Sequence, residues 1–160
     1  MRIVGIDPGL KATGYAFLDC EKGGLKLLEA GTIEPKAREP IQERIHAVYR
    51  NLDVLLEQYH PDVLVLEKLY AHYKHPVTAA IMGHARGVIC LLCAQRKIGL
   101  AEYPVKRIRS AVTGNGNSTK LQTRSVVAHM LKVDATKLTL DASDAIALGL
   151  GHIHIMRCKI

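Results

Sequence analysis

The first nine residues constrain the fold more than any other stretch, because an apolar run stops at an acid and a forced turn. The apolar residues Ile3, Val4 and Ile6 suit a strand that is buried on both faces, and the Pro-Gly pair after the acid cannot continue it. Asp7 is therefore expected at the carboxyl end of a strand, the edge where α/β sheets bind ligands. An Asp in an Asp-Pro-Gly turn can also serve only to hydrogen-bond nearby amides, so this stretch alone leaves both interpretations open.

A second apolar strand, residues 62–67, also ends in an acid, Glu67. The residues before it predict an amphipathic helix, with apolar side chains at Ile41, Ile45, Val48, Leu52, Leu56 and Tyr59. A helical crossover between two apolar strands implies a parallel pair whose carboxyl ends share one edge of the sheet. Asp7 and Glu67 should therefore be neighbours, and two neighbouring carboxylates repel each other unless a cation or a shared proton holds them.

The remaining elements complete a mixed sheet. Residues 12–19 and 25–33 predict strands that form an antiparallel meander with the first one, and residues 99–103 predict a fifth strand. Helices are predicted over residues 77–97 and 105–112, and another opens at Lys120 with Ser118 or Asn117 as its cap.

Two pairs of glycines are predicted to have different roles, one pair in turns and the other in close helix packing. Turn geometry is the favoured explanation for Gly9 and Gly14, although either could instead let a phosphate or another backbone approach closely. Gly83 and Gly87 lie inside the helix predicted over 77–97, where each costs roughly 1 kcal/mol relative to alanine. Close packing against another backbone, either the sheet or a second subunit, should compensate for that cost.

The last predicted helix carries two further acids, Asp141 and Asp144. Their spacing of three residues places both on one face of its first turns. An acid at a helix amino terminus complements the helix dipole, which would explain Asp141 without any function. Asp144 lies among apolar residues, so its buried charge needs a partner. No Lys or Arg occurs between Lys137 and Arg157, which leaves a distant cation or a metal.

Size and composition fit a single domain spanning residues 1–160, with 48% hydrophobic and 23% charged residues. The chain contains neither an apolar run of membrane-spanning length nor a signal-peptide pattern, so a cytoplasmic protein is expected. Four cysteines occur without the paired Cys and His clusters of a structural zinc site. Cys90 and Cys93 are predicted to pack inside a helix rather than to carry redox chemistry.

The formal net charge of +7 is concentrated in one region, residues 96–124, which holds seven Lys or Arg residues against one Glu. Such a concentration favours a nucleic-acid-binding face, without distinguishing DNA from RNA. The basic residues predicted to contact nucleic acid are Lys106, Arg107, Arg109, Lys120 and Arg124. Lys120 and Arg124, one turn apart at a helix amino terminus, could clamp a phosphate. The loop after Glu67 adds aromatic, His and basic residues, including Tyr70, that can stack on unpaired bases.

Taken in order, these motifs resemble the RuvC-type Holliday junction resolvases of the ribonuclease H-like superfamily. The segments that carry the resemblance are Ile6-Asp7-Pro8-Gly9 with Thr13-Gly14, Glu67, Ala85-Arg86-Gly87, Val112 to Lys120, and Asp141 to Ala145 with His152. The resemblance covers almost the whole chain. It implies a ribonuclease H-like α/β fold, in which a three-stranded antiparallel meander and parallel strands form a five-stranded mixed sheet flanked by helices.

The resemblance also implies a function: metal-dependent nicking of four-way DNA junctions by a homodimer in recombination and repair. By similarity, the catalytic and metal-binding carboxylates are Asp7, Glu67, Asp141 and Asp144. Arg109 and Lys120 fall where the family has basic DNA-contacting residues, and Tyr70 falls where members can place an aromatic near the crossover. A branch-migration helicase is a further candidate partner. The roles of His152 and His154 stay open.

An all-oxygen ligand set suits Mg²⁺ or Mn²⁺, and two ions roughly 4 Å apart could activate water and stabilise the leaving 3′ oxygen. A DNA-binding module with the same fold but no cleavage is the main alternative. Actin-like kinases and ATPases are a further alternative, because they have a pattern similar to the Asp-x-Gly-x-x-x-Thr-Gly of residues 7–14. Such enzymes usually need two related lobes.

Overall fold

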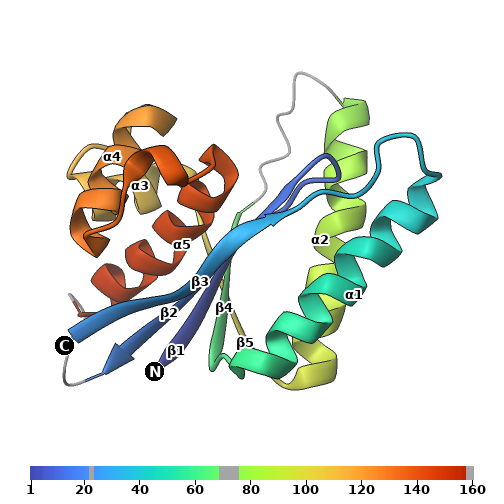
Figure 1. The fold of residues 1–160 in the computed structure, drawn as a ribbon, viewed down its shortest axis with the longest axis horizontal. Helices are drawn as coiled ribbons and strands as arrows, with labels where there is room; N and C mark the ends of the chain where they lie inside the picture. The colour runs from blue at the N-terminus through green and yellow to red at the C-terminus, as the bar shows by residue number, and fades with distance from the viewer. Residues whose placement is uncertain (22–23, 69–75, 158–160) are drawn as a thin grey trace.

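The computed structural model has a five-stranded sheet in the middle and helices on both faces (Figure 1). It describes residues 1–21, 24–68 and 76–157. The strands are β1 (Arg2–Asp7), β2 (Thr13–Glu21), β3 (Gly24–Ile33), β4 (Val63–Glu67) and β5 (Gly99–Tyr103). The helices are α1 (Ile41–Tyr59), α2 (Pro76–Arg96), α3 (Val105–Thr113), α4 (Lys120–Leu131) and α5 (Leu140–Arg157), with a short 3₁₀ turn η1 (Ala135–Lys137).

The sheet is mixed, with the strand order β3-β2-β1-β4-β5. Strands β1, β2 and β3 form the predicted antiparallel meander. Strands β1, β4 and β5 are parallel, with Ile6 opposite Leu66 at the last register position shared by β1 and β4. This arrangement confirms the predicted fold class and brings the ends of β1 and β4 together.

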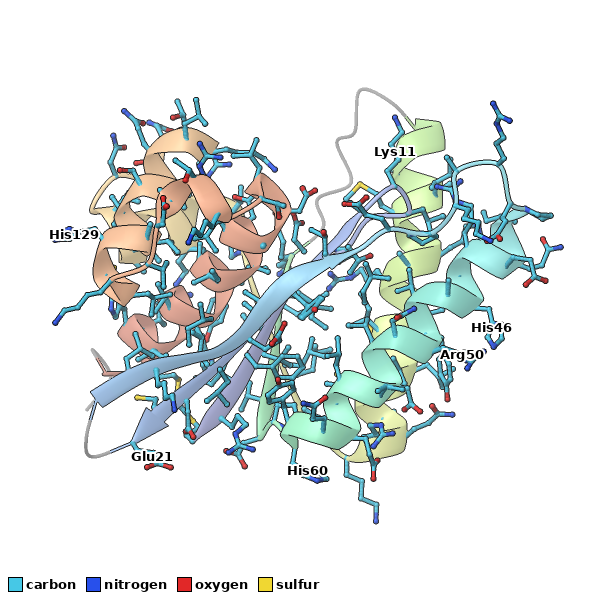
Figure 2. All side chains as sticks on the ribbon, viewed as in Figure 1. Lys11, Glu21, His46, Arg50, His60 and His129 are labelled. Carbon is cyan, nitrogen blue, oxygen red and sulfur yellow. The ribbon has the colours of Figure 1, made fainter. Side chains whose placement is uncertain are left out.

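Two layers of helices cover the sheet. Helices α1 and α2 lie over one face, and α3, α4 and α5 lie over the other (Figure 1). Alternate side chains of β1 enter the two cores, because successive residues of a strand point to opposite faces. Val4 and Ile6 pack with α1 and α2, whereas Ile3 packs with α5. The outer surface of α1 is polar, and Figure 2 shows His46 and Arg50 pointing away from the sheet.

Helix α5 lies unusually close to β1 and β2, because two glycines leave room for its backbone. A Cβ atom on Gly5 would lie 2.0 Å from the carbonyl oxygen of Ala145, and one on Gly14 would lie 2.1 Å from that of Asp141. Turn geometry is therefore the wrong explanation for Gly14, whose lack of a side chain admits α5. At Gly9 the atoms nearest to such a Cβ belong to the backbone of Ala12, in agreement with a turn.

Two other expectations need correction. Thr119, rather than Ser118 or Asn117, caps α4: its hydroxyl accepts the amide of Gln122 at 3.2 Å, and the Gln122 side chain accepts the Thr119 amide at 2.9 Å. This reciprocal pair satisfies two amides that would otherwise lack partners. The hydroxyl of Ser118 bonds instead with Thr113 and the carbonyl oxygen of Asn115.

The glycines of α2 do not pack against the sheet. Within the described residues, nothing lies within 4 Å of a Cβ built on Gly83 or Gly87. The sequence left two surfaces open as packing partners for these glycines, the sheet and a second subunit, and the sheet is therefore excluded. Cys90 and Cys93 lie in α2 as predicted, and Cys93 is buried in the core beside the sheet. No helix in the described part of the chain has the length and apolar character needed to cross a lipid bilayer.

Candidate active site

A pocket of about 220 Å³ opens where β1 and β4 end beside α5. Carboxylates from three remote segments line it: Asp7 on β1, Glu67 on β4 and Asp144 on α5. The parallel pairing of β1 with β4 brings the first two together, and the close approach of α5 adds the third. Proximity of Asp7 and Glu67, predicted from the helical crossover, is confirmed.

Asp141 lies one turn before Asp144 on α5 but is not among the residues that line the pocket. Its carboxylate is nevertheless near enough to raise the pKa of Asp7 by electrostatic repulsion. The first turn of α5 is fixed by Thr139, whose hydroxyl accepts the amide of Ala142 at 3.1 Å. Three of the four predicted acids therefore line the pocket, and the fourth, Asp141, lies at its margin.

Burial and mutual repulsion perturb the acids in the pocket. Burial, reinforced by the nearby negative charge of Asp144, raises the pKa of Asp7 to about 7, although the positive charge of Lys120 opposes the rise. Burial also raises the pKa of Glu67, again reinforced by Asp144 and opposed by Arg109, Lys120 and Arg86. Perturbed carboxyl groups that share a pocket indicate a functional site, because such repulsion is tolerated where a cation is to be bound.

The partner of Asp144 is Lys120, whose ammonium group reaches from α4 to form an ion pair with the Asp144 carboxylate. The negative charge of Asp144 is thus neutralised by a lysine that is distant in the sequence. A distant cation was one of the two partners that the sequence left open, the other being a metal. Burial lowers the pKa of Lys120, but the hydrogen bond to Asp144 and the negative charges of Asp144, Asp7 and Asp141 more than offset this and raise it. A lysine at the first position of a helix opposes the helix dipole, so the acids of the pocket account for its location.

The predicted DNA-contacting residues divide into two groups. Arg109 and Lys120 line the pocket together with the acids. Lys106 and Arg107 lie exposed on α3, where the Arg107 guanidinium stacks over the ring of Tyr103 at 5.5 Å, and Arg124 is half-buried on α4 without lining the pocket. The proposed phosphate clamp of Lys120 with Arg124 stays a prediction. Tyr70 falls outside the described residues.

The two C-terminal histidines lie away from the pocket. His152 is buried, and its Nδ1 atom makes a hydrogen bond of 2.9 Å with the hydroxyl of Tyr103. Burial lowers its pKa. His154 bonds through Nδ1 to the carbonyl oxygen of Ala111 at 2.8 Å. Both histidines tie α5 to its neighbours β5 and α3.

The ligand chemistry of the pocket fits a hard divalent cation. Its acidic side chains offer only oxygen atoms, which Mg²⁺ and Mn²⁺ prefer. Among the described residues, no three His, Cys, Asp or Glu side chains are already gathered into a metal-binding cluster. Mg²⁺ usually keeps several waters and takes only one or two carboxylates from the protein, so it does not need a closed cage.

The sequence matches a known protein family over most of its length. The family model described as crossover junction endodeoxyribonuclease RuvC matches residues 3–152. This chain belongs to the RuvC family. The RuvC crossover junction endodeoxyribonuclease of Rhodopirellula baltica is 38% identical over 151 residues, which cover 94% of this chain and 85% of the relative. That of Finegoldia magna is 34% identical over 96% of this chain and 93% of its own length.

Solved structures of RuvC proteins show the same fold. Thermus thermophilus RuvC superposes with a TM-score of 0.88 at 22% identity and covers 99% of this chain and 97% of its own. The same protein in complex with a Holliday junction substrate gives a TM-score of 0.87 at 20% identity, over 99% and 96% of the two chains. The ribonuclease H-like architecture expected from the sequence is thereby confirmed.

Proposed function

We propose that this protein resolves four-way DNA junctions by divalent-metal-dependent hydrolysis of the phosphodiester backbone, with Asp7, Glu67, Asp141 and Asp144 as the metal-binding carboxylates. The observation that supports this most strongly is the convergence of Asp7, Glu67 and Asp144 on one pocket that also holds Arg109 and Lys120. RuvC relatives that match over most of the chain carry the name of this activity. A DNA-binding module that does not cut would have no need for buried, mutually repelling acids.

The residues of the pocket have distinct tasks in this mechanism. Asp7, Glu67 and Asp144, with Asp141 at the margin, would hold Mg²⁺ or Mn²⁺, and four carboxylates suffice for two ions. When bound, such ions activate water for attack and stabilise the leaving oxygen. Arg109 and Lys120 would hold the scissile phosphate and oppose its developing negative charge. Lys106 and Arg107, exposed on α3, would bind flanking phosphates.

The proposed activity is tested by mapping incisions on a synthetic four-way junction with Mg²⁺, with Mn²⁺ and with EDTA. We expect paired nicks at symmetric positions near the branch point with either metal, no nicks in EDTA, and no cutting of a linear duplex of the same sequence. Tight binding without nicks in either metal would favour the non-cleaving alternative. Equal cutting of junction and duplex would contradict junction selectivity.

Metal affinity should depend on pH around neutrality, because a proton competes with the metal for Asp7. Its pKa of about 7 in the folded, metal-free protein means that Asp7 must lose a proton to become a ligand below this pH. Affinity for Mg²⁺ should fall by up to about tenfold per pH unit below 7 and level off above 8. Calorimetric titrations from pH 5.5 to 8.5 in two buffers of different ionisation enthalpy would measure both affinity and proton release. A flat profile without proton release would contradict the role of Asp7.

We also propose that the protein acts as a homodimer through α2, since two opposed strands of a junction must be cut in concert. The outward face of α2 is exposed and made of small or apolar residues with one histidine: Ala80, Gly83, His84, Gly87, Leu91 and Ala94. Nothing in the described chain covers its two glycines, and Leu91 is 51% exposed. Such a face permits close approach of a second helix, which would offset the unfavourable helix propensity of the glycines.

A bulky charge in this face should separate the subunits. Gly87→Arg is expected to shift the protein from dimer to monomer in sedimentation velocity at micromolar concentration. Ser125→Arg, on an exposed position of α4 across the sheet, should remain dimeric as a matched control. A wild-type protein that is monomeric under cleavage conditions, or a Gly87→Arg protein that stays dimeric, would contradict the proposed interface.

A further inference from the structure

Arg86 reaches from α2 to the end of β4, where none of the roles described above accounts for it. Its Nη1 atom donates a hydrogen bond to the main-chain carbonyl oxygen of Glu67 at 2.7 Å. Its Nη2 atom forms an ion pair with the carboxylate of Glu102 on β5. The Arg86 side chain is only 14% exposed, whereas that of Glu102 is 40% exposed. One guanidinium thus connects α2, β4 and β5 at the edge of the pocket.

These contacts fix the last peptide of β4 at both of its polar atoms. The amide of Lys68 donates to the carbonyl oxygen of Tyr103 at 2.8 Å, while the carbonyl of Glu67 in the same peptide accepts from Arg86. The ladder between β1 and β4 ends at Ile6 opposite Leu66, so it does not include the peptide that joins Glu67 to Lys68. A peptide is planar, so fixing both its amide and its carbonyl sets the orientation of the peptide plane that joins Glu67 to Lys68.

We propose that Arg86 is a positioning residue for Glu67: by holding the Glu67 main chain and anchoring to Glu102, it keeps the Glu67 carboxylate directed into the pocket shared with Asp7 and Asp144. The inference rests on the proposed function, in which Glu67 binds metal. Arginine suits the task because its planar fork donates in two directions at once. A lysine has a single point charge and could not hold both partners with the same geometry.

Removing the Arg86 guanidinium distinguishes a positioning role from a purely electrostatic one, because the two roles predict opposite changes in Mn²⁺ affinity. Arg86→Met keeps an unbranched apolar side chain but deletes a positive charge beside the acids. If Arg86 acted only through its charge, Mn²⁺ would bind more tightly to the variant. If it positions Glu67, affinity should fall by about 10-fold, the scale on which loss of outer-shell partners weakens metal binding. Electron paramagnetic resonance of free Mn²⁺ at pH 8.5, above the pKa of Asp7, measures the difference.

Two variants control for loss of an ion pair as such. Arg96→Met removes a guanidinium from the same helix, where it pairs with Asp53 and Glu57 and lines no part of the pocket, so Mn²⁺ affinity should not change. Glu102→Gln leaves Arg86 free to donate to Glu67 but loosens its anchor, and a smaller fall of about 3-fold is expected. If Arg86→Met folds poorly, hydrogen exchange of the Lys68 amide in Glu102→Gln serves instead, because loss of the Glu102 charge would by itself weaken Mn²⁺ binding.

Hydrogen exchange of the Lys68 amide provides a readout that needs no metal. In Arg86→Met this amide should exchange about 10-fold faster, while amides in the middle of β4 keep their wild-type rates. A wild-type protein that binds no Mn²⁺ would count against the proposed function, and the exchange result would still decide the role of Arg86. Unchanged exchange at Lys68, or Mn²⁺ affinity in Arg86→Met equal to or above wild type, would overturn the inference.

Discussion

The Asp7→Asn protein should bind a four-way junction with wild-type affinity and cut it at least about 10³-fold more slowly. Asp7 is the acid that the pocket perturbs most, and the neutral amide of the variant would be a poor ligand for a divalent ion. Loss of metal-assisted stabilisation amounts to several kcal/mol of activation free energy, which corresponds to this loss of rate. Single-turnover cleavage at saturating protein, with binding measured separately in Ca²⁺, separates the two quantities.

The same variant should be more stable than the wild type when no metal is present. The folded-state pKa of Asp7, about 7, lies above its ordinary value of 3.8. Stability contributed by the protonated form is therefore complete below pH 3.8 and is lost as pH rises through 7. At pH 8 in EDTA, the uncharged amide avoids that loss, and Asp7→Asn should raise the free energy of unfolding by roughly 1–4 kcal/mol. The advantage should shrink toward pH 4, and also with Mg²⁺ at pH 8.

Asp134→Asn is a matched control for both results. Asp134 is exposed and accepts the Thr136 amide at 2.9 Å, a task that asparagine performs equally well. We expect the Asp134→Asn protein to cut at the wild-type rate, and its free energy of unfolding in EDTA should not rise. An Asp7→Asn protein that cuts at more than about a tenth of the wild-type rate, or that is less stable than the wild type in EDTA, would contradict the assignment of Asp7.

Gly5→Ala should strongly destabilise the fold. The new Cβ would lie 2.0 Å from the carbonyl oxygen of Ala145 and 3.0 Å from the amide nitrogen of Gly149, both in the backbone of α5. Backbone atoms cannot rotate aside as a side chain does, so α5 would have to move away from the sheet. A loss of about 3–5 kcal/mol is expected, at the upper end for single substitutions. Urea denaturation followed by circular dichroism would measure it.

Gly83→Ala, made in the Gly87→Arg protein so that no second subunit covers this face, offers the corresponding control. Its added methyl group meets nothing within 4 Å in the described chain, and alanine favours the helix, so stability should stay equal or rise by up to about 1 kcal/mol. If Gly5→Ala instead unfolds within about 1 kcal/mol of the wild type, α5 does not depend on Gly5 for its close approach. The same movement of α5 would displace Asp144 from the pocket, so any folded Gly5→Ala protein should also cut poorly.

The sequence allowed the first half of the site to be predicted, because it depends on local pattern and simple topology. An antiparallel meander followed by a helical crossover makes the first and fourth strands parallel, and their terminal acids, Asp7 and Glu67, therefore lie at the same edge of the sheet. The role of these acids as metal ligands stays a prediction. The concentration of charge in residues 96–124 likewise indicated a basic region, and two of its members, Arg109 and Lys120, line the pocket.

The other half depends on packing that a linear pattern does not encode. Lys120 and Asp144 lie on different helices, so nothing in their sequence context showed that they would pair. Gly14 was interpreted through its turn, although its small size matters because α5 passes directly over it. Arg86 appeared within a family motif, but its contact with the Glu67 carbonyl arises only where α2 crosses the end of β4.

The most direct test is a crystal of the wild-type protein soaked in Mn²⁺ and measured for anomalous scattering at the manganese edge. We expect anomalous density in the pocket, within coordination distance of oxygen atoms from Asp7, Glu67 and Asp144, with the Lys120 ammonium displaced from Asp144. Density elsewhere on the protein, or Asp7 and Glu67 directed away from each other with no metal between them, would contradict a metal-binding site built from these acids.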